Sequence, residues 1–184
     1  MNRLLKRTAA GLLIALSLSA CSMFAPPDAN RLLVGLAPVN ELGYEVTDSG
    51  IVVETRTLQI SARAGMPLTN VSGYRVEYRS EAGSLLGETS DVPQTLNVTV
   101  PPGWQCAQPD PVTGCNAFSE GARPATGVPA SLESAQNQLL NADIIQMHLL
   151  AGQPTGWYAE LTLFYDNVYG EFEETYRINI VVPN

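Results

Sequence analysis

Lysine is nearly missing from this sequence: Lys6 is the only one among 184 residues. The first twenty residues hold three of the ten basic side chains and none of the eighteen acidic ones. The remaining chain therefore carries seven positive against eighteen negative side chains, a net charge of −11. Such an acidic surface repels nucleic acid and anionic lipid headgroups. The composition excludes a nucleic-acid-binding protein and, after residue 20, any chemistry that uses lysine.

Histidine is as scarce as lysine. His148 is the only one, so any Ser-His-Asp triad or histidine metal site must include it. The chain contains no Gly-x-Ser-x-Gly elbow, no His-Glu-x-x-His pair and no phosphate-binding glycine loop. A pair of carboxylates could form a glycosidase site, but the sequence identifies no such pair. We therefore expect no catalytic residues, no metal and no cofactor, and predict that the protein is not an enzyme.

Long apolar runs are confined to the N-terminus. Three basic residues precede a ten-residue apolar run, 9–18, which is too short to span a bilayer but typical of a signal peptide. The run ends in Leu18-Ser19-Ala20-Cys21, which resembles the lipobox of bacterial lipoproteins. The resemblance implies that residues 1–20 are a signal peptide and that Cys21 is lipidated and becomes the first mature residue. The alternative is an incidental cysteine beside an ordinary secretory cleavage site.

The same resemblance implies a location. Ser22, rather than Asp, follows Cys21, which in the enterobacterial sorting pattern indicates the outer membrane. Two or three acyl chains such as palmitate hold a protein far more firmly than one chain. We therefore expect residues 21–40 to be a lipidated N-terminus and tether, and the membrane of the cell envelope to be a partner through this anchor.

Only two cysteines remain after lipidation. Cys106 and Cys115 are nine positions apart in a turn-rich segment, and an even pair in an oxidising compartment predicts a disulfide. A metal site is the alternative, but two thiols need further ligands and the chain offers one histidine. Closing this loop of about ten residues should stabilise the domain by about 2–3 kcal/mol.

Most of the remaining chain alternates apolar and polar residues with turns between the runs. Tyr74, Val76 and Tyr78 share one face of a strand that turns at 82–83, which predicts a hairpin. A second hairpin is predicted around residues 166–170. The alternation slips within 52–62, which indicates a bulge or two short strands.

About seven short antiparallel strands predict an all-β fold, a single β-sandwich over residues 41–184. The tyrosine-rich hairpins at 74–88 and 157–182 resemble those of immunoglobulin-like or fibronectin-type-III-like domains. The resemblance is one of pattern and covers roughly residues 44–182. It implies an Ig-like fold but no function.

Residues 101–131 interrupt this rhythm with six prolines, four glycines and both cysteines. We expect a long loop stapled by its disulfide, and loops of this length are often functional. Residues 131–140 then predict a short helix with Ser131 as its N-cap. Residues 144–150 predict a strand on which His148 is partly exposed.

Trp104 lies in the 101–131 loop and Trp157 follows a glycine, so we expect both to be exposed candidates for partner contact. The turn around 166–174 gathers acidic and amide side chains, whose oxygens are the ligands that Ca²⁺ prefers. The spacing matches no EF-hand loop, however, and acids at hairpins usually keep an edge soluble. The residues of this turn are Asp166, Asn167, Glu171, Glu173 and Glu174.

The sequence thus predicts a lipid-anchored envelope protein with a structural or protein-binding role and no catalysis. A rigid sandwich holds loops, and loops carry recognition, so we expect the partner to be an envelope protein that contacts the 101–131 loop. The alternative is a carbohydrate-binding or polysaccharide-associated lipoprotein that uses Trp104 and Trp157.

Overall fold

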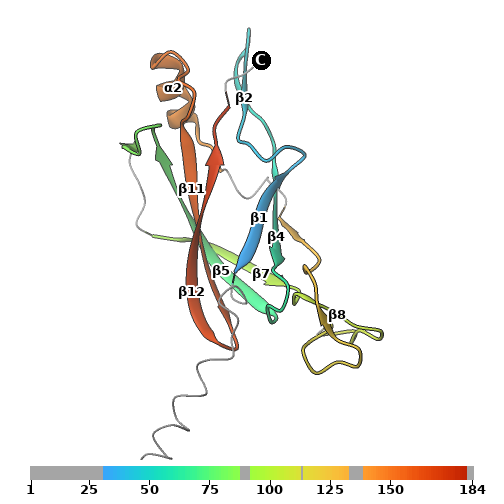
Figure 1. Cartoon of the computed structure of the whole chain (residues 1–184). Coiled ribbons are helices and arrows are strands. Elements are labelled where there is room, and N and C mark those ends of the chain that lie inside the picture. Colours follow the sequence, from blue (N-terminus) through green and yellow to red (C-terminus); the bar gives the residue numbers. More distant parts are fainter. Residues whose placement is uncertain (1–30, 88–91, 113, 133–138, 182–184) are drawn as a thin grey trace, which may run out of the picture.

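The computed structural model describes residues 31–87, 92–112, 114–132 and 139–181. Residues 1–30, which include the segment expected to be a signal peptide and Cys21, lie outside this part. Two antiparallel sheets pack face to face (Figure 1). The smaller sheet has the order β1 (Leu32–Ala37), β4 (Thr57–Ala62) and β10 (Ala130–Leu132). The larger sheet has the order β12 (Gly170–Asn179), β11 (Tyr158–Asn167), β5 (Thr69–Arg79) and β6 (Leu85–Leu86), and β7 (Gln94–Val100) also pairs with β5. The all-β sandwich is confirmed.

The core lies between the two sheets and follows the alternation of the sequence. On β11, Ala159, Leu161, Leu163 and Tyr165 all point inward and are at most 4 % exposed. They meet the inward residues of the smaller sheet, among them Ile60, which is fully buried. Side chains that alternate with period two place all their apolar surface on one face, and burying that face holds the two sheets together.

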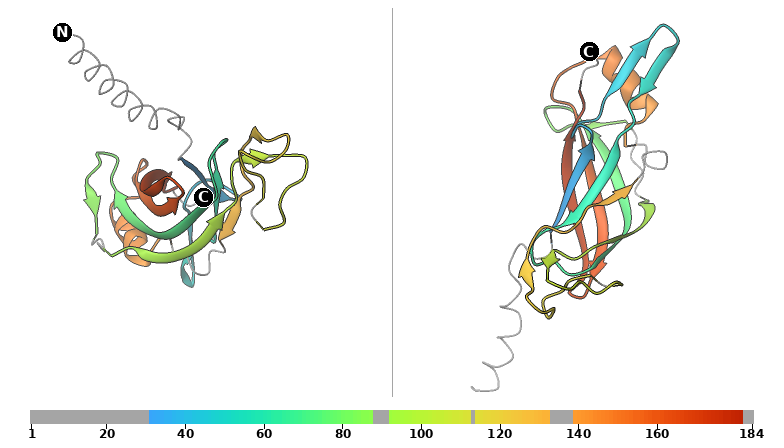
Figure 2. Two further views of the ribbon diagram at one scale, coloured as in Figure 1. Left: turned by 90° about the horizontal axis from the view of Figure 1, so that it is seen from below. Right: turned by 90° about the vertical axis from the view of Figure 1, so that its right-hand side faces the viewer.

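Both predicted hairpins are present. Tyr78 pairs with Leu86 in the β5–β6 hairpin, and Asn167 pairs with Gly170 at the tip of the β11–β12 hairpin. The slip in residues 52–62 marks the boundary between β3 (Gly50–Val53) and β4. A further hairpin, β2 (Tyr44–Thr47) with β3, was not predicted and projects from one end of the sandwich (Figure 2).

The predicted strand at 144–150 is wrong, because these residues form α2 (Ala142–Leu150). The side-chain oxygen of Asn141 caps its first turn by accepting a hydrogen bond from the Ile144 amide. Ile144, Ile145 and His148 share the buried face, which is helical spacing. A short apolar run fits a strand and a helix equally well, and here the N-cap decides.

The predicted helix start at Ser131 is also wrong, because Ser131 pairs with Gln59 within the smaller sheet. Residues 133–138 of that predicted helix lie outside the described part of the chain. The segment 101–131 is therefore less irregular than expected. It contains the small ladder of β8 (Trp104–Gln105) and β9 (Arg123–Pro124), and its last residues enter the smaller sheet through β10.

The sandwich has two distinct ends (Figures 1 and 2). The hairpin end comprises the β2–β3 hairpin (44–53) and α2 (142–150). The loop end comprises residues 101–129 and the turn 166–170. The described chain enters at the loop end, because the Arg31 carbonyl accepts from the Arg63 amide, and Arg63 adjoins Gly103 at the base of the loop.

Candidate functional site

The β2–β3 hairpin exposes apolar side chains on both of its faces. Val46 and Ile51 are paired across the strands, which favours the hairpin locally. Only Tyr44, at the base of the hairpin, is buried in the sandwich; Val46, Ile51, Val52 and Val53 are 52, 41, 51 and 40 % exposed. An isolated two-stranded hairpin is only marginally stable in water. Four exposed β-branched residues on such an arm mark it as a surface for contact.

The hairpin and α2 are joined at their bases by His148. This side chain is fully buried. Its Nε2 lies 2.9 Å from the Pro154 carbonyl and its Nδ1 lies 2.8 Å from the Tyr44 hydroxyl. Because a carbonyl can only accept, Nε2 carries the proton, and the Tyr44 hydroxyl donates to Nδ1. The partly exposed histidine of the sequence prediction is thus wrong: helical geometry turns the ring inward, where it supports the hairpin end.

Trp157 is part of the same cluster. Its ring centroid lies 5.0 Å from that of His148, and the residue is only 8 % exposed. The expectation of an exposed Trp157 is therefore wrong. The turn that precedes it, after α2, folds the indole under the helix rather than outward. Burial removes Trp157 as a contact residue and makes it part of the support for the hairpin end.

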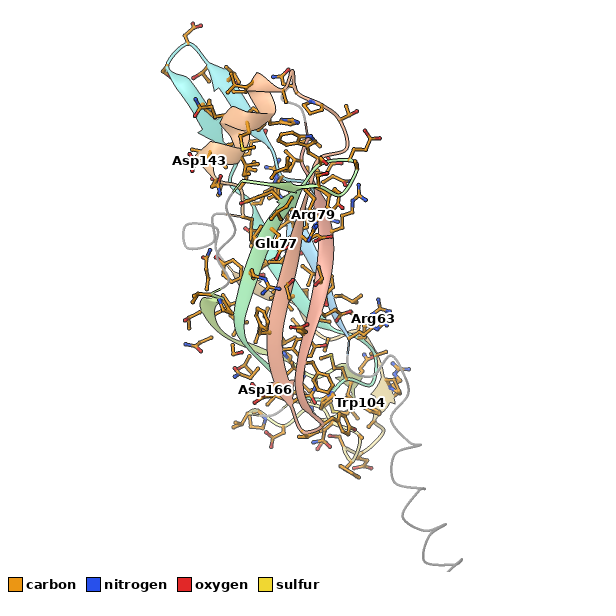
Figure 3. All side chains as sticks on the ribbon, turned by 90° about the vertical axis from the view of Figure 1, so that its left-hand side faces the viewer. Arg63, Glu77, Arg79, Trp104, Asp143 and Asp166 are labelled. Carbon is orange, nitrogen blue, oxygen red and sulfur yellow. A yellow bond between two sulfur atoms is a disulfide. The ribbon has the colours of Figure 1, made fainter. Side chains whose placement is uncertain are left out.

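Acidic side chains surround the exposed apolar surface of the hairpin end. Among residues 41–56, Arg56 is the only basic residue whose charge offsets these acids. Its guanidinium pairs with Glu54 and donates a hydrogen bond to the Glu41 carbonyl. The acidic residues at this end are Glu41, Glu45, Asp48, Glu54 and, on α2, Asp143 (Figure 3). The arrangement is an apolar centre with a rim of net negative charge, in which Arg56 pairs with Glu54 and Arg177 lines a groove together with Glu41.

The outer face of the larger sheet differs from the hairpin end in being covered by paired charges. Arg79 pairs with Glu77 at 2.8 Å and with Glu160 on the neighbouring strand. The Arg177 guanidinium lies 3.8 Å above the centroid of the Tyr158 ring. Arginine side chains thus cover aromatic surface and satisfy the carboxylates there. Among the described residues of β11 and β12, the outward aromatic rings of Tyr158 and Phe164 are covered by Arg177 and Arg75.

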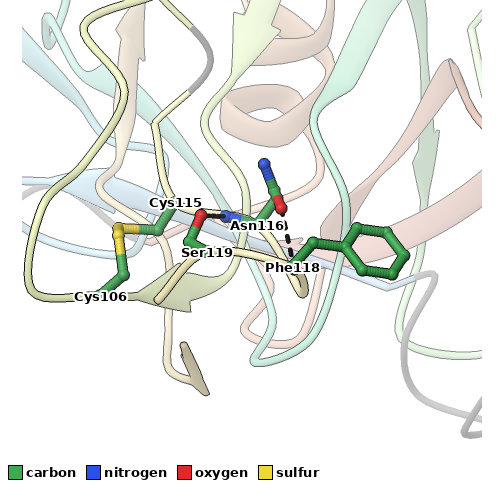
Figure 4. The surroundings of a disulfide bond; sticks show 5 residues. All are labelled: Cys106, Cys115, Asn116, Phe118 and Ser119. Carbon is green, nitrogen blue, oxygen red and sulfur yellow. Dashed lines mark hydrogen bonds between the residues drawn. A yellow bond between two sulfur atoms is a disulfide. The ribbon is translucent and has the colours of Figure 1, made fainter. Parts of the chain in front are cut away.

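At the loop end the predicted disulfide is present, with Cys106 and Cys115 joined (Figure 4). Trp104 is only partly exposed. Its ring lies beside the Gly65 backbone: a Cβ atom placed on Gly65 would be 4.0 Å from the ring. The most exposed apolar residues here are Phe118, at 98 %, and Val112, at 87 %. Trp104 and Trp157 lie at opposite ends of the sandwich, so they cannot form a shared platform for stacking a sugar.

The acidic turn does not bring its five side chains together. The Asp166 carboxylate accepts from the Asn70 side-chain amide, and the Asn167 side chain accepts from the Tyr169 backbone amide. Glu174 points to the other face, where it accepts from the Leu32 amide at 3.2 Å. Among the described residues, no group of three acidic, histidine or cysteine side chains is placed to hold a metal ion. The ligands that a calcium site needs are divided between two faces of the hairpin.

A groove of about 460 Å³ lies beside this turn, between β5, β11 and β12. It contains three carboxylates, those of Asp166, Glu171 and Glu173, and Asp166 lies directly across the ladder from Glu171. All three are exposed. The groove is also lined by the aromatic residues Phe164, Tyr165 and Phe172, and it leaves its carboxylates in contact with solvent.

Comparison with protein-family models finds no match, and comparison with curated proteins finds none either. No helix in the part of the chain that the structure describes is long and apolar enough to cross a membrane. The hairpin end was missed in the sequence, although turn residues between β-branched runs, Asp48-Ser49-Gly50, were a signal for it.

Proposed function

We propose that the protein is a lipoprotein of the bacterial cell envelope, anchored through Cys21, that binds a protein partner with its hairpin end and carries out no catalysis. The observation that carries this proposal is the set of exposed apolar side chains on the β2–β3 hairpin, at the end opposite Arg31. The proposed recognition surface is therefore formed by Val46, Ile51 and Val52 on the hairpin, whereas the sequence alone favoured Trp104 in the 101–131 loop.

The position of the anchor supports this choice. Cys21 precedes Arg31 by ten residues, a length of chain that spans at most about 33–36 Å when extended. An acylated Cys21 would therefore keep the loop end near the bilayer. The ten residues of β11 run about 33 Å from one end of the sandwich to the other. The hairpin end then points away from the membrane, where another envelope protein can reach it.

The chemistry of the hairpin end also defines its partner. Within the described residues, β3 pairs only with β2, so its outer edge can accept a strand from another chain. The acidic rim favours a partner whose own contact surface is apolar with a basic border. Opposite charges around the contact speed the encounter and make its rate sensitive to salt.

The proposal is tested by capturing partners from native envelopes. Amine-reactive reagents have almost nothing to attach to, because the chain after residue 20 has no lysine, so a carboxyl-directed crosslinker is required. The triple variant Val46→Thr, Ile51→Thr, Val52→Thr keeps the β-branched shape but removes apolar surface. We expect it to lose the captured partner, while Val168→Thr at the loop end keeps it. Undiminished capture by the triple variant would place the contact elsewhere.

The anchor has its own test. We expect Cys21→Ala to stop incorporation of labelled fatty acid and to release the protein from the membrane fraction. A Cys21→Ala protein that still carries labelled acyl chains would refute the anchor without bearing on the hairpin.

A further inference from the structure

Five large apolar side chains at the loop end are more than half exposed: Val128, at 71 %, follows Gly127 at the base of the segment, and the other four lie at the tips of turns. Val112 and Phe118 are 87 and 98 % exposed within the 101–129 segment, and Val168 and Tyr169 are 80 and 57 % exposed in the β11–β12 turn. Figures 1 and 2 show both segments at the same end of the sandwich. They are separate tips around the rim of this end rather than one continuous patch.

Phe118 is held outward by local hydrogen bonds. The Asn116 side chain accepts from the Phe118 amide at 2.9 Å, and the Ser119 hydroxyl accepts from the Asn116 amide at 3.0 Å. The adjoining disulfide fixes Cys115, the residue just before this turn (Figure 4). Because the backbone of the turn is already fixed, burying the ring against another surface orders only the Phe118 side chain.

The whole segment is fixed to the sandwich at its base. The Gly103 amide donates to the Met66 carbonyl, and the Gly127 amide donates to the Ala62 carbonyl. A side chain at Gly103 would begin 1.8 Å from the Arg63 carbonyl oxygen, so the backbones touch there. The tips therefore keep a defined position relative to Arg31, whose carbonyl accepts from the Arg63 amide.

The charge of this segment differs from that of the chain as a whole. Residues 104–129 contain Asp110, Glu120 and Arg123, a net charge of −1, whereas the chain after residue 20 has a net charge of −11. The neighbouring turn is acidic at Asp166 and Glu171. Apolar tips with little positive charge suit a surface of zwitterionic headgroups better than an anionic one.

We propose that the loop end rests on the bilayer, with Phe118, Val112 and the tip at 168–169 at the boundary between headgroups and acyl chains. This contact rests on the proposed acylation of Cys21, since Cys21 precedes Arg31 by only ten residues and the membrane is therefore within reach. Tyrosine is enriched at this interfacial depth, and phenylalanine is among the apolar residues that interfacial segments bury there. Acyl chains and inserted side chains then hold the domain in one orientation, with the hairpin end outward.

The test uses the full acylated protein in phosphatidylcholine vesicles whose acyl chains are brominated near the headgroup, because bromine quenches tryptophan emission at contact. Phe118→Trp adds a reporter at the loop end. Leu150→Trp adds a matched reporter at the hairpin end, where Leu150 is 82 % exposed. Emission from Trp104 and Trp157 is removed by subtracting the unsubstituted protein. We expect brominated lipid to remove most of the emission added by Phe118→Trp and to leave that added by Leu150→Trp unchanged.

Acyl labelling of the same preparations separates this contact from the anchor. Labelled protein in which both reporters are quenched equally, or neither is quenched, would overturn the bilayer contact and leave the anchor intact. Capture of a partner protein that is lost on Phe118→Ala would also overturn it, because the tip would then be occupied by protein. Protein without acyl label would overturn the anchor and this contact together.

Discussion

The two ends of the sandwich are stabilised in different ways. At the hairpin end, a buried histidine ring joins strand β2, helix α2 and the turn before β11 through its two nitrogens. At the loop end, the long segment is held by backbone hydrogen bonds at Gly103 and Gly127 and by a disulfide. The first end therefore depends on the identity of a few side chains. The second depends on closely packed backbone and on a covalent bond.

The ends also expose apolar surface in different forms. The hairpin end offers a strand, β3, that pairs only with β2 within the described part of the chain and is flanked by acidic residues, which suits a structured protein partner. The loop end offers isolated side chains at turn tips, which suits a fluid surface. The same sandwich thus presents two surfaces of different chemistry at the two ends of β11, a ten-residue strand about 33 Å long.

The largest expected effect is at the hairpin end. His148→Ala removes a fully buried ring and leaves the Tyr44 hydroxyl and the Pro154 carbonyl without their partner. We expect the free energy of unfolding to fall by about 3–5 kcal/mol, measured by urea denaturation. Phe118→Ala at the loop end is the control and should change it by less than about 0.5 kcal/mol. Equal effects of the two substitutions would mean that the histidine does not support its end.

The next effect is at the loop end. Replacing both Cys106 and Cys115 with serine should lower the free energy of unfolding by about 2–3 kcal/mol, because the unfolded chain regains the entropy of the open loop. Partner capture by the hairpin end should be unchanged in the same variant. If capture fell together with stability, the structure of the hairpin end would depend on the disulfide at the loop end, and the two ends would not be independent.

A smaller effect tests how α2 begins. Asn141→Ala removes the side-chain oxygen that accepts from the Ile144 amide, and we expect a loss of about 1 kcal/mol in the free energy of unfolding. Amide hydrogen exchange should become faster in the first turn of α2 and stay unchanged at the base of the loop. Asn141→Asp retains an acceptor and serves as the matched control, with most of the stability kept.

The smallest expected effect is a change in the pKa of one buried tyrosine and not of another, which distinguishes the two ends. Burial, which outweighs a hydrogen bond, raises the pKa of Tyr78 to about 12, and burial together with the Glu174 carboxylate raises the pKa of Tyr165 to about 12. Tyr165 is the nearer of the two to the loop end. Glu174→Gln should therefore lower the pKa of Tyr165 and leave the pKa of Tyr78 unchanged. Absorbance of tyrosinate during an alkaline titration measures both, with Tyr165→Phe and Tyr78→Phe assigning the steps.

The same shifts predict how stability depends on pH. The unfolded chain releases tyrosine protons near pH 10, whereas the folded chain keeps those of Tyr78 and Tyr165 to about pH 12. The folded state thus binds more protons between these values, so the free energy of unfolding falls as the pH rises from 10 to 12. A flat stability profile over this interval would contradict the burial of the two hydroxyls.

Part of the fold could be predicted from the sequence because it depends on residues that are close together along the chain. Tyr74, Val76 and Tyr78 alternate with charged residues, and the strand and its turn appear where this pattern places them. The short runs were not readable in the same way. Residues 144–150 fit both periods, and only the Asn141 cap and the contact of His148 with Tyr44 select the helix.

What the sequence determined by itself is what can be counted or read locally: the acidic charge, the scarcity of lysine, the alternation along β11 and a disulfide between the two cysteines that follow Cys21. The tertiary structure alone decided that Trp157 and His148 are buried, that Ser131 joins a sheet and that the exposed hairpin lies opposite Arg31. The reason is distance along the chain. Tyr44 and His148 are 104 positions apart, and no local pattern encodes which distant residue a side chain will meet.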